Sequence, residues 1–304
     1  MGFAITCPGQ GVLKNCLLKP YLRFPIKNIL NDVNESLGYD FTRQLIDNDE
    51  LWLKNTANAQ PAIFTITYLI ANICTQHLGL RLDKASVILG HSLGEYSALC
   101  LNGTLSLSTT IRLVTLRGKL MEKLQNDRYG MKILMLRPDK FDKIQEYCLQ
   151  KEVLANINNH QQITISGFNE KLDQIIQDLK SKKLIMRSTE LPVKIPFHSP
   201  QLSVVEPELS RFLDSEPINP STFPLITNLT GEMSHDINDT ISVNSKPVNW
   251  VKSINSLQQL EISDIINLGP SQVLYNLNKK FPYQNHILDE LTSSEITAVQ
   301  SILS

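Results

Sequence analysis

The 304-residue sequence predicts an α/β protein in which a large, mostly parallel-sheet domain carries an inserted ferredoxin-like (βαββαβ) subdomain. Three observations predict this. Short β-branched runs alternate with helical patterns in the first third. A Gly-x-Ser-x-Gly motif, typical of a nucleophile elbow, directly follows one of those runs. The middle of the chain then has the order strand, helix, strand, strand, helix, strand. We expect the large catalytic domain at 1–127 and 194–304 and the small subdomain at 128–193.

The first third supplies the strands and helices around the motif. Residues 3–7 form an apolar run that ends in the turn sequence PGQG, and residues 56–78 carry apolar side chains at helical spacing. Residues 85–89 have β-branched residues at their centre and are stopped by Gly90, which indicates a buried strand. Ser106 or Ser108 is placed to cap a helix that continues to residue 124.

The middle of the chain has the pattern of a split ferredoxin-like unit. The expected strands cover residues 131–136, 153–156, 163–166 and 184–187, and the expected helices cover residues 141–150 and 170–179. Beyond this unit the chain returns to the large domain. Residues 234–246 are polar and predict an exposed loop.

Composition narrows the classes of function. The chain has 29 basic and 30 acidic residues and a formal net charge of -1, so we expect no nucleic-acid partner. Its most apolar stretch, 62–73, is too short for a membrane span. Five scattered cysteines predict free thiols, with neither disulfides nor a metal site. The N-terminus shows neither a secretory nor a transit pattern, so a targeting segment is either absent or already removed.

Residues 90–94 read GHSLG and are the sharpest chemical signal. A strand–turn–helix setting pushes the hydroxyl of Ser92 out of the backbone, and glycines two positions away on either side relieve crowding. Such a match also occurs by chance in glycine-containing turns, and the preceding strand is what favours a nucleophile.

A serine nucleophile needs a general base, because its hydroxyl is weakly nucleophilic at neutral pH. Of the six histidines, His198 is the best candidate, since it lies in the segment KIPFHSP, where two prolines stiffen an irregular loop. His91 adjoins Ser92, but neighbouring side chains on a sharp turn diverge. A purely structural role for His198 remains the alternative on spacing alone.

Several ordered blocks resemble the malonyl-CoA:acyl-carrier-protein transacylase family. They span nearly the whole chain and read PGQG, AQPA, GHSLGEYSAL, RGxxM, ANIN with ISG, PFH, PVNW and NLGP with VL. The sequence departs from the family at Val12 and Leu13, which favours a divergent, organellar member. It departs again at Ser271, which stands in place of a glycine.

The resemblance implies a role for each matching residue. Ser92 is the nucleophile and His198 its base, and a carbonyl near Asn267 orients the imidazole. Arg117 binds the substrate carboxylate by two parallel hydrogen bonds. The remaining residues implied in the site are Gln10 and Leu93, whose backbone N–H groups form an oxyanion hole, Gln60, which lines the pocket, and Phe197, which favours malonyl over methylmalonyl groups.

The same resemblance implies transfer of a malonyl group from malonyl-CoA to the phosphopantetheine thiol of acyl carrier protein, for fatty acid synthesis. It implies that the reaction needs no metal or redox cofactor. We further expect a monomer, in the mitochondrial matrix or otherwise in the cytoplasm. Two alternatives stay open: a serine thioesterase or esterase of α/β-hydrolase type, and a catalytically silent subunit that docks carrier protein.

Overall fold

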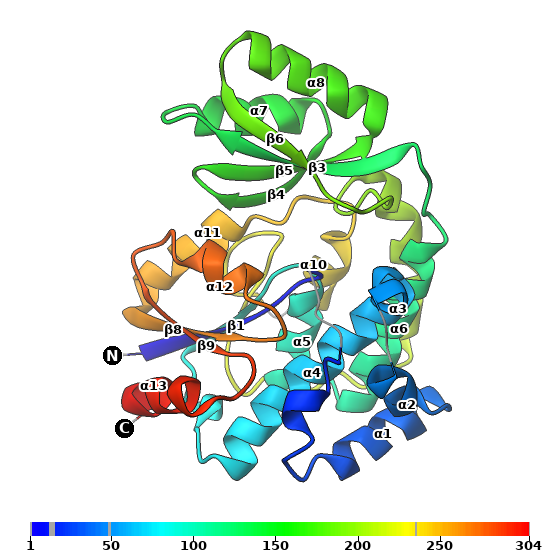
Figure 1. Cartoon of the computed structure of the whole chain (residues 1–304), viewed down its shortest axis with the longest axis vertical. Coiled ribbons are helices and arrows are strands. Elements are labelled where there is room, and N and C mark those ends of the chain that lie inside the picture. Colours follow the sequence, from blue (N-terminus) through cyan, green and yellow to red (C-terminus); the bar gives the residue numbers. More distant parts are fainter. Residues whose placement is uncertain (1, 12–15, 48–49, 235, 304) are drawn as a thin grey trace.

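The computed structural model describes residues 2–11, 16–47, 50–234 and 236–303. Two sheets and their helices make up this part of the chain, with one sheet above the other in Figure 1. Val12 and Leu13, where the sequence departs from the family pattern, lie outside the described residues. No helix within the described ranges has the length and apolar character needed to span a bilayer.

The larger sheet has five parallel strands in the order β7-β2-β1-β8-β9. These strands are β1 (Gly2–Cys7), β2 (Val87–Gly90), β7 (Leu225–Ile226), β8 (Ile262–Leu268) and β9 (Gln284–Leu288). Along β1 the side chains alternate between faces. Phe3 and Ile5 enter one core cluster and Ala4 enters the other, as the two-residue period of a strand requires.

Helices cover both faces of this sheet. One core cluster joins it to α4 (Thr56–His77), α5 (Leu93–Leu101) and α6 (Leu107–Glu122), and the other joins it to α11 (Trp250–Asn255) and α12 (Val273–Asn278). The remaining helices of this part are α1 (Lys27–Leu37), α2 (Phe41–Ile46), α3 (Glu50–Lys54), α9 (Glu206–Asp214), α10 (Ile237–Ser242) and α13 (Ser293–Leu303). The side chain of Ser106 caps α6, which decides between the two predicted caps.

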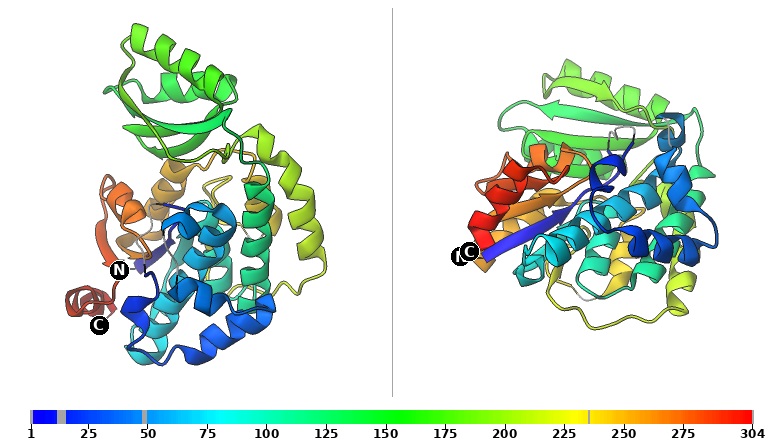
Figure 2. Two further views of the ribbon diagram at one scale, coloured as in Figure 1. Left: turned by 45° about the vertical axis from the view of Figure 1, so that its right-hand side comes forward. Right: turned by 60° about the horizontal axis from the view of Figure 1, so that its bottom comes forward.

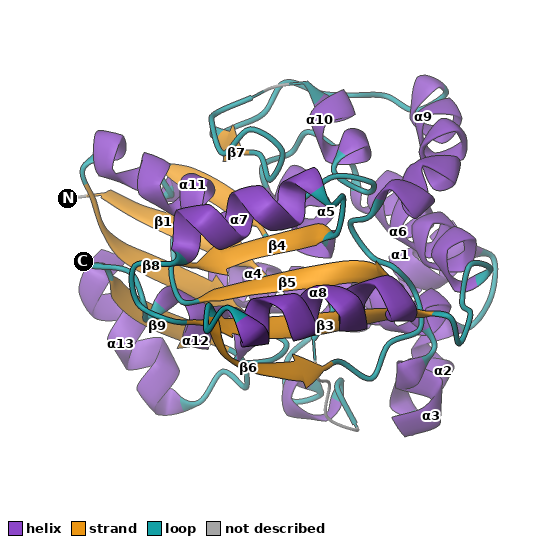
Figure 3. Ribbon diagram, turned by 90° about the horizontal axis from the view of Figure 1, so that it is seen from above, coloured by secondary structure: helices purple, strands orange, loops and turns teal. Residues whose placement is uncertain are grey.

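The second sheet is antiparallel, with strand order β4-β5-β3-β6. Its elements are β3 (Tyr129–Leu136), α7 (Phe141–Gln150), β4 (Leu154–Asn159), β5 (Gln162–Phe168), α8 (Asn169–Ser181) and β6 (Ile185–Glu190). Both helices lie on one face of the sheet (Figure 3). The parallel and antiparallel sheets confirm the predicted fold class, while the boundaries at 128 and 193 remain a prediction.

The edge strand β4 ties the small sheet to the large domain. The N–H of Ile157 donates to the carbonyl of Val248 at 2.9 Å, and the N–H of Val248 donates to the carbonyl of Ala155 at 2.9 Å. Trp250, at the start of α11, is fully buried in a cluster that also includes side chains of β4 and β5. The small subdomain therefore lies against α11 and the segment before it, above the large domain in both views of Figure 2.

Residues 234–246 differ from the sequence prediction of an exposed loop. They contain α10, and Thr240, Ile241, Val243 and Asn244 are buried. The prediction followed the polar composition and missed Ile237 and Ile241, which lie one helical turn apart and pack against the large core cluster. This segment contributes directly to the site described below.

The crossing of α4 and α6 provides a test of packing. A Cβ on Gly118 would lie 2.8 Å from the carbonyl oxygen of Thr56, so Gly118→Ala forces the two helices apart. The helix propensity of alanine favours the change by about 1 kcal/mol, but overpacking typically costs about 1–3 kcal/mol. We expect a net loss of roughly 1 kcal/mol in the free energy of unfolding, measured by urea denaturation.

Ser108→Ala, on the same helix, is the matched control and should change that free energy by less than about 0.5 kcal/mol. A Gly118→Ala protein more stable than wild type would show that the helices separate without cost.

Candidate active site

The site lies at the carboxyl ends of three neighbouring parallel strands. The chain leaves β1 toward Gln10, leaves β2 toward Ser92, and leaves β7 toward Asn228. Ligands of open α/β sheets bind at this edge, because the loops there converge and the helices that follow begin there.

Ser92 lies in a sharp turn between β2 and α5. Its φ of 55° and ψ of -114° are rarely adopted by a residue with a side chain, and such backbone strain typically costs about 1–3 kcal/mol. A Cβ on Gly90 would overlap the carbonyl group of Gly94, and one on Gly94 would overlap the carbonyl of Cys7. Only glycine fits at both positions, which gives the GHSLG spacing its physical reason.

His198 lies directly against the serine. Its Nε2 is 2.6 Å from the Ser92 Oγ, and its Nδ1 is 2.8 Å from the carbonyl oxygen of Val243. Because a carbonyl only accepts, Nδ1 carries the proton and Nε2 presents a lone pair to the serine hydroxyl. The pair can therefore pass the serine proton to the imidazole during nucleophilic attack.

The predicted role of Asn267 is wrong. The side chain of Asn267 instead joins strands: its Oδ1 accepts from the Thr6 hydroxyl at 2.8 Å and from Asn278 Nδ2 at 2.6 Å. The carbonyl of Gly269, in the same predicted turn, accepts from Thr67 at 2.7 Å. The carbonyl that orients His198 comes from Val243, at the end of α10, in the segment that the sequence analysis treated as an exposed loop.

Arg117 projects from α6 into the same space. Its Nη1 donates to Gln60 Oε1 at 2.8 Å, its Nε donates to Asn244 Oδ1 at 2.8 Å, and its Nη2 is 3.5 Å from the Ser92 Oγ. The guanidinium also lies over the ring of Tyr96, 5.2 Å from the ring centroid. These contacts hold the guanidinium of Arg117 beside the nucleophile, and Gln60 is one of the hydrogen-bond acceptors that position it.

No carboxylate of the described residues forms an ion pair with Arg117, and the buried carboxyl of Glu95 acts on its charge only from a longer distance. Arg117 is 2% exposed, and its hydrogen-bond partners are neutral. Burial lowers the pKa of this guanidinium from its ordinary value. A buried, unpaired cation is costly, so the arrangement favours an anionic group of a ligand at this position.

One backbone N–H group beside Ser92 is left without an acceptor among the described residues. The N–H groups of Ser92, Gly94 and Glu95 already donate to Asn228 Oδ1, the His91 carbonyl and the Ser92 carbonyl. Within the described part of the chain the N–H of Leu93, the first residue of α5, donates to no acceptor. Gln10 follows Gly9, which abuts His91 in the same turn. The role of the Leu93 and Gln10 N–H groups as oxyanion donors stays a prediction.

Phe197 is half-buried and packs against the large core cluster, directly before His198. Its predicted role in acyl selection stays a prediction. The sequence analysis missed Asn228, Val243 and Asn244, which hold Ser92, His198 and Arg117 respectively. Asn228 is the first residue of the turn that follows the apolar pair of β7, and a turn asparagine at the end of a strand is the one signal that could have indicated its role.

Buried titratable groups surround the serine. Burial, reinforced by the charge of Arg117, lowers the pKa of His198 to about 3, so the imidazole is neutral at physiological pH. Burial also raises the pKa of Glu95, one turn along α5, to about 7. Among the described residues no three His, Cys, Asp or Glu side chains group as metal ligands.

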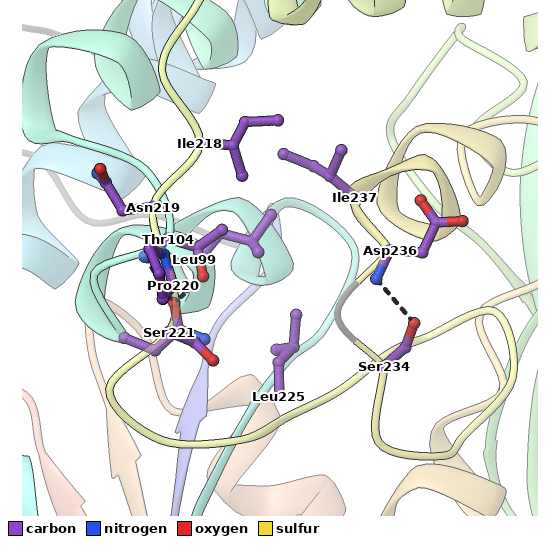
Figure 4. A pocket seen from close by; sticks show the side chains of 11 residues that line it. Leu99, Thr104, Ile218, Asn219, Pro220, Ser221, Leu225, Ser234, Asp236 and Ile237 are labelled. Atoms are coloured by element: carbon purple, nitrogen blue, oxygen red, sulfur yellow. Dashed lines mark hydrogen bonds between the residues drawn. The ribbon is translucent and has the colours of Figure 1, made fainter.

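A separate cavity of about 350 Å³ lies beyond the far end of α5. Leu99, Leu225 and Ile237 are among the residues that line it, together with the polar residues Ser234 and Asp236 (Figure 4). None of its lining residues belongs to the Ser92 site.

Comparison with known proteins identifies the family. The sequence profile of the acyl transferase domain matches residues 19–269. The chain belongs to the acyl transferase domain family.

This acyl transferase domain is similar to two proteins named malonyl CoA-acyl carrier protein transacylase. It is 28% identical to one from Bacillus subtilis over 86% of the chain and 66% of the relative, and 29% identical to one from Staphylococcus aureus over 91% of each. The chain thus spans just under two thirds of the first of these relatives.

Solved structures share the fold along the whole chain. An acyl-carrier-protein S-malonyltransferase from Bartonella henselae superposes with a TM-score of 0.89 at 28% identity, covering 100% of this chain and 99% of that one. A malonyl-transacylase in complex with its type II PKS acyl-carrier protein superposes with a TM-score of 0.88 at 25% identity, covering 99% and 100%.

The low pKa of His198 predicts how this acyl transferase responds to pH. The neutral imidazole is the form that accepts the serine proton, and the folded protein keeps it neutral down to about pH 3. We expect the rate of serine acylation, measured by rapid quench, to stay level from about pH 8 to about pH 5 and to fall only at lower pH.

If His198 had the pKa of an unperturbed histidine, the rate of acylation would instead fall as the pH drops through about 6.5. Glu95, with a raised pKa of about 7, could produce a transition in the same region, so Glu95→Gln serves as the control. A transition near pH 6.5 that persists in Glu95→Gln would contradict a base held neutral by burial.

Proposed function

We propose that this chain transfers a malonyl group from malonyl-CoA to the phosphopantetheine thiol of an acyl carrier protein, for fatty acid synthesis. The observation that carries the proposal is the guanidinium of Arg117, which is buried 3.5 Å from the nucleophile and forms no ion pair with a carboxylate of the described residues. A malonyl group carries a carboxylate one methylene away from the thioester carbonyl, and this carboxylate would supply a negative charge beside the guanidinium. The names of the relatives support the same substrate.

The acyl-enzyme forms first. The Ser92 Oγ attacks the thioester carbon while His198 Nε2 takes the hydroxyl proton, and the N–H groups of Leu93 and Gln10 bind the oxyanion. Collapse of the tetrahedral intermediate breaks the carbon–sulfur bond, and the imidazolium gives its proton to the departing coenzyme A thiolate. The product of this half-reaction is a malonyl ester of Ser92.

Transfer to the carrier reverses these roles. The phosphopantetheine thiol attacks the ester carbon as His198 takes the thiol proton, and the same proton returns to the Ser92 oxygen when the ester bond breaks. All atoms and protons balance with the thioester substrate alone, so the proposed reaction uses no metal or redox cofactor. The solved complex of a related transacylase with its carrier protein supports this partner.

Two alternatives are weaker. An α/β-hydrolase orders its residues Ser…Asp…His, whereas here a backbone carbonyl orients a histidine that about a third of the chain follows. A silent docking subunit does not need an imidazole 2.6 Å from the serine hydroxyl. Assignment to the mitochondrial matrix, or otherwise to the cytoplasm, remains a prediction, as does the monomeric state.

Replacement of Arg117 tests the substrate class. In Arg117→Ala the carboxylate loses two charge-assisted hydrogen bonds, so kcat/KM for malonyl transfer to carrier protein should fall by about 10²–10³-fold. Arg117→Lys keeps the positive charge but loses the two parallel N–H donors of the guanidinium. Its kcat/KM should therefore lie between those of wild type and Arg117→Ala. Transfer of acetyl from acetyl-CoA, which has no carboxylate, should not fall in Arg117→Ala.

Arg112→Ala is the matched control. Arg112 lies on the same helix and pairs with Glu216 at 2.7 Å, away from Ser92. Its variant should transfer malonyl like wild type. An equal loss of malonyl and acetyl transfer in Arg117→Ala would contradict the proposed recognition.

A further inference from the structure

A single buried amide closes the turn around the nucleophile. Asn228, two residues after β7, is 1% exposed. Its Oδ1 accepts from the N–H of Ser92 at 2.9 Å, while its Nδ2 donates to the carbonyl of Gly90. The two backbone groups flank His91, where the chain leaves β2 and enters the sharp turn, so the amide acts as a brace on the entry side of that turn.

A buried carboxyl fixes the orientation of this amide. Glu95 is fully buried, and its Oε2 accepts from the backbone N–H of Asn228 at 2.7 Å and also from Asn228 Nδ2. Its Oε1 accepts from the Thr240 hydroxyl at 2.6 Å. If the amide were flipped, Nδ2 would face the Ser92 N–H, and Oδ1 would face the Gly90 carbonyl and the ionised form of the Glu95 carboxyl, so like groups would oppose each other.

The brace determines which groups remain for catalysis. It holds Ser92 in its uncommon backbone conformation and occupies the Ser92 N–H, so that the next N–H, of Leu93, is left for the oxyanion. It also keeps the Ser92 Oγ 2.6 Å from His198 Nε2. No hydrogen bond of the Asn228 side chain reaches the Ser92 hydroxyl or Arg117.

We propose that Asn228 is a positioning residue of acyl transfer, which holds the nucleophile turn, and that Glu95 fixes its amide in the working orientation. The inference rests on the proposed function, since it assigns Ser92 as the nucleophile. It predicts that loss of the amide lowers reactivity of Ser92 while binding of the acyl carboxylate through Arg117 is preserved.

The test compares Asn228→Ala and Asn228→Asp with wild type. Aspartate keeps the shape and the acceptor but loses the Nδ2 donor and sets a second carboxyl against Glu95. Both variants should lose about 10²-fold or more in kcat for malonyl transfer, because small misplacements of reacting groups have effects of this size. The KM for malonyl-CoA should stay within about threefold, since the contacts of Arg117 are intact.

Reaction with phenylmethylsulfonyl fluoride gives an independent readout. This reagent tests the serine without a carboxylate or coenzyme A, and the rate of inactivation should fall in parallel with kcat. If wild type reacts with the reagent but transfers no malonyl group, the proposed function fails while the brace can still be measured.

Glu95 provides the rescue experiment. In Glu95→Gln the side-chain oxygen can face Asn228 and the new amide can donate to the Thr240 hydroxyl, which turns to accept. Activity should remain within about fivefold of wild type, whereas Glu95→Ala should lose at least a further tenfold. Thr230→Ala is the control, because Thr230 lies in the same turn as Asn228 and bonds to Thr227 at 2.9 Å.

The proposal is overturned if folded Asn228→Ala and Asn228→Asp keep both rates within threefold of wild type. It would also be overturned if the Asn228 variants changed only the KM for malonyl-CoA and not kcat, or if Glu95→Gln were as inactive as Glu95→Ala. Circular dichroism and thermal melting establish the fold of each variant, and if the Asn228 variants do not fold, the comparison of Glu95→Gln with Glu95→Ala decides.

Discussion

The whole site depends on the close approach of the start of α5 to β1 and β2, which leaves space for only one backbone path between β2 and α5. Gly90 and Gly94 are required because a Cβ at either position would overlap neighbouring backbone. Ser92 is thereby held at a φ of 55° with its hydroxyl outside the turn. This strain is balanced by contacts from elsewhere in the fold, which is why a nucleophile in such a conformation needs a rigid sheet behind it.

The end of α10 connects the other two active groups. Val243 and Asn244 are adjacent, yet the carbonyl of the first accepts from His198 and the side chain of the second accepts from Arg117. The base and the guanidinium therefore share one support, and a shift of this turn moves both relative to Ser92. Thr240, in the same helix, binds Glu95 and so links this support to α5.

Sequence reasoning predicted what depends on local patterns. The two-residue and 3.6-residue periods predicted both sheets, and the glycine spacing predicted the turn around Ser92. The partners of Ser92, His198 and Arg117 lie from 45 to 136 residues away along the chain and could not be read from spacing. The carbonyl beside His198 was assigned to the wrong segment because any residue can supply a carbonyl, so side-chain chemistry does not mark it.

The central claim is that Ser92 carries the acyl group between two thiols. Intact-mass analysis after mixing the protein with malonyl-CoA, without carrier protein, tests it most directly. The account predicts one malonyl group added per chain, no adduct on Ser92→Ala, and loss of the adduct when carrier protein with its phosphopantetheine thiol is added. An unmodified wild-type chain that steadily releases free malonate, or an adduct that persists in Ser92→Ala, would contradict it.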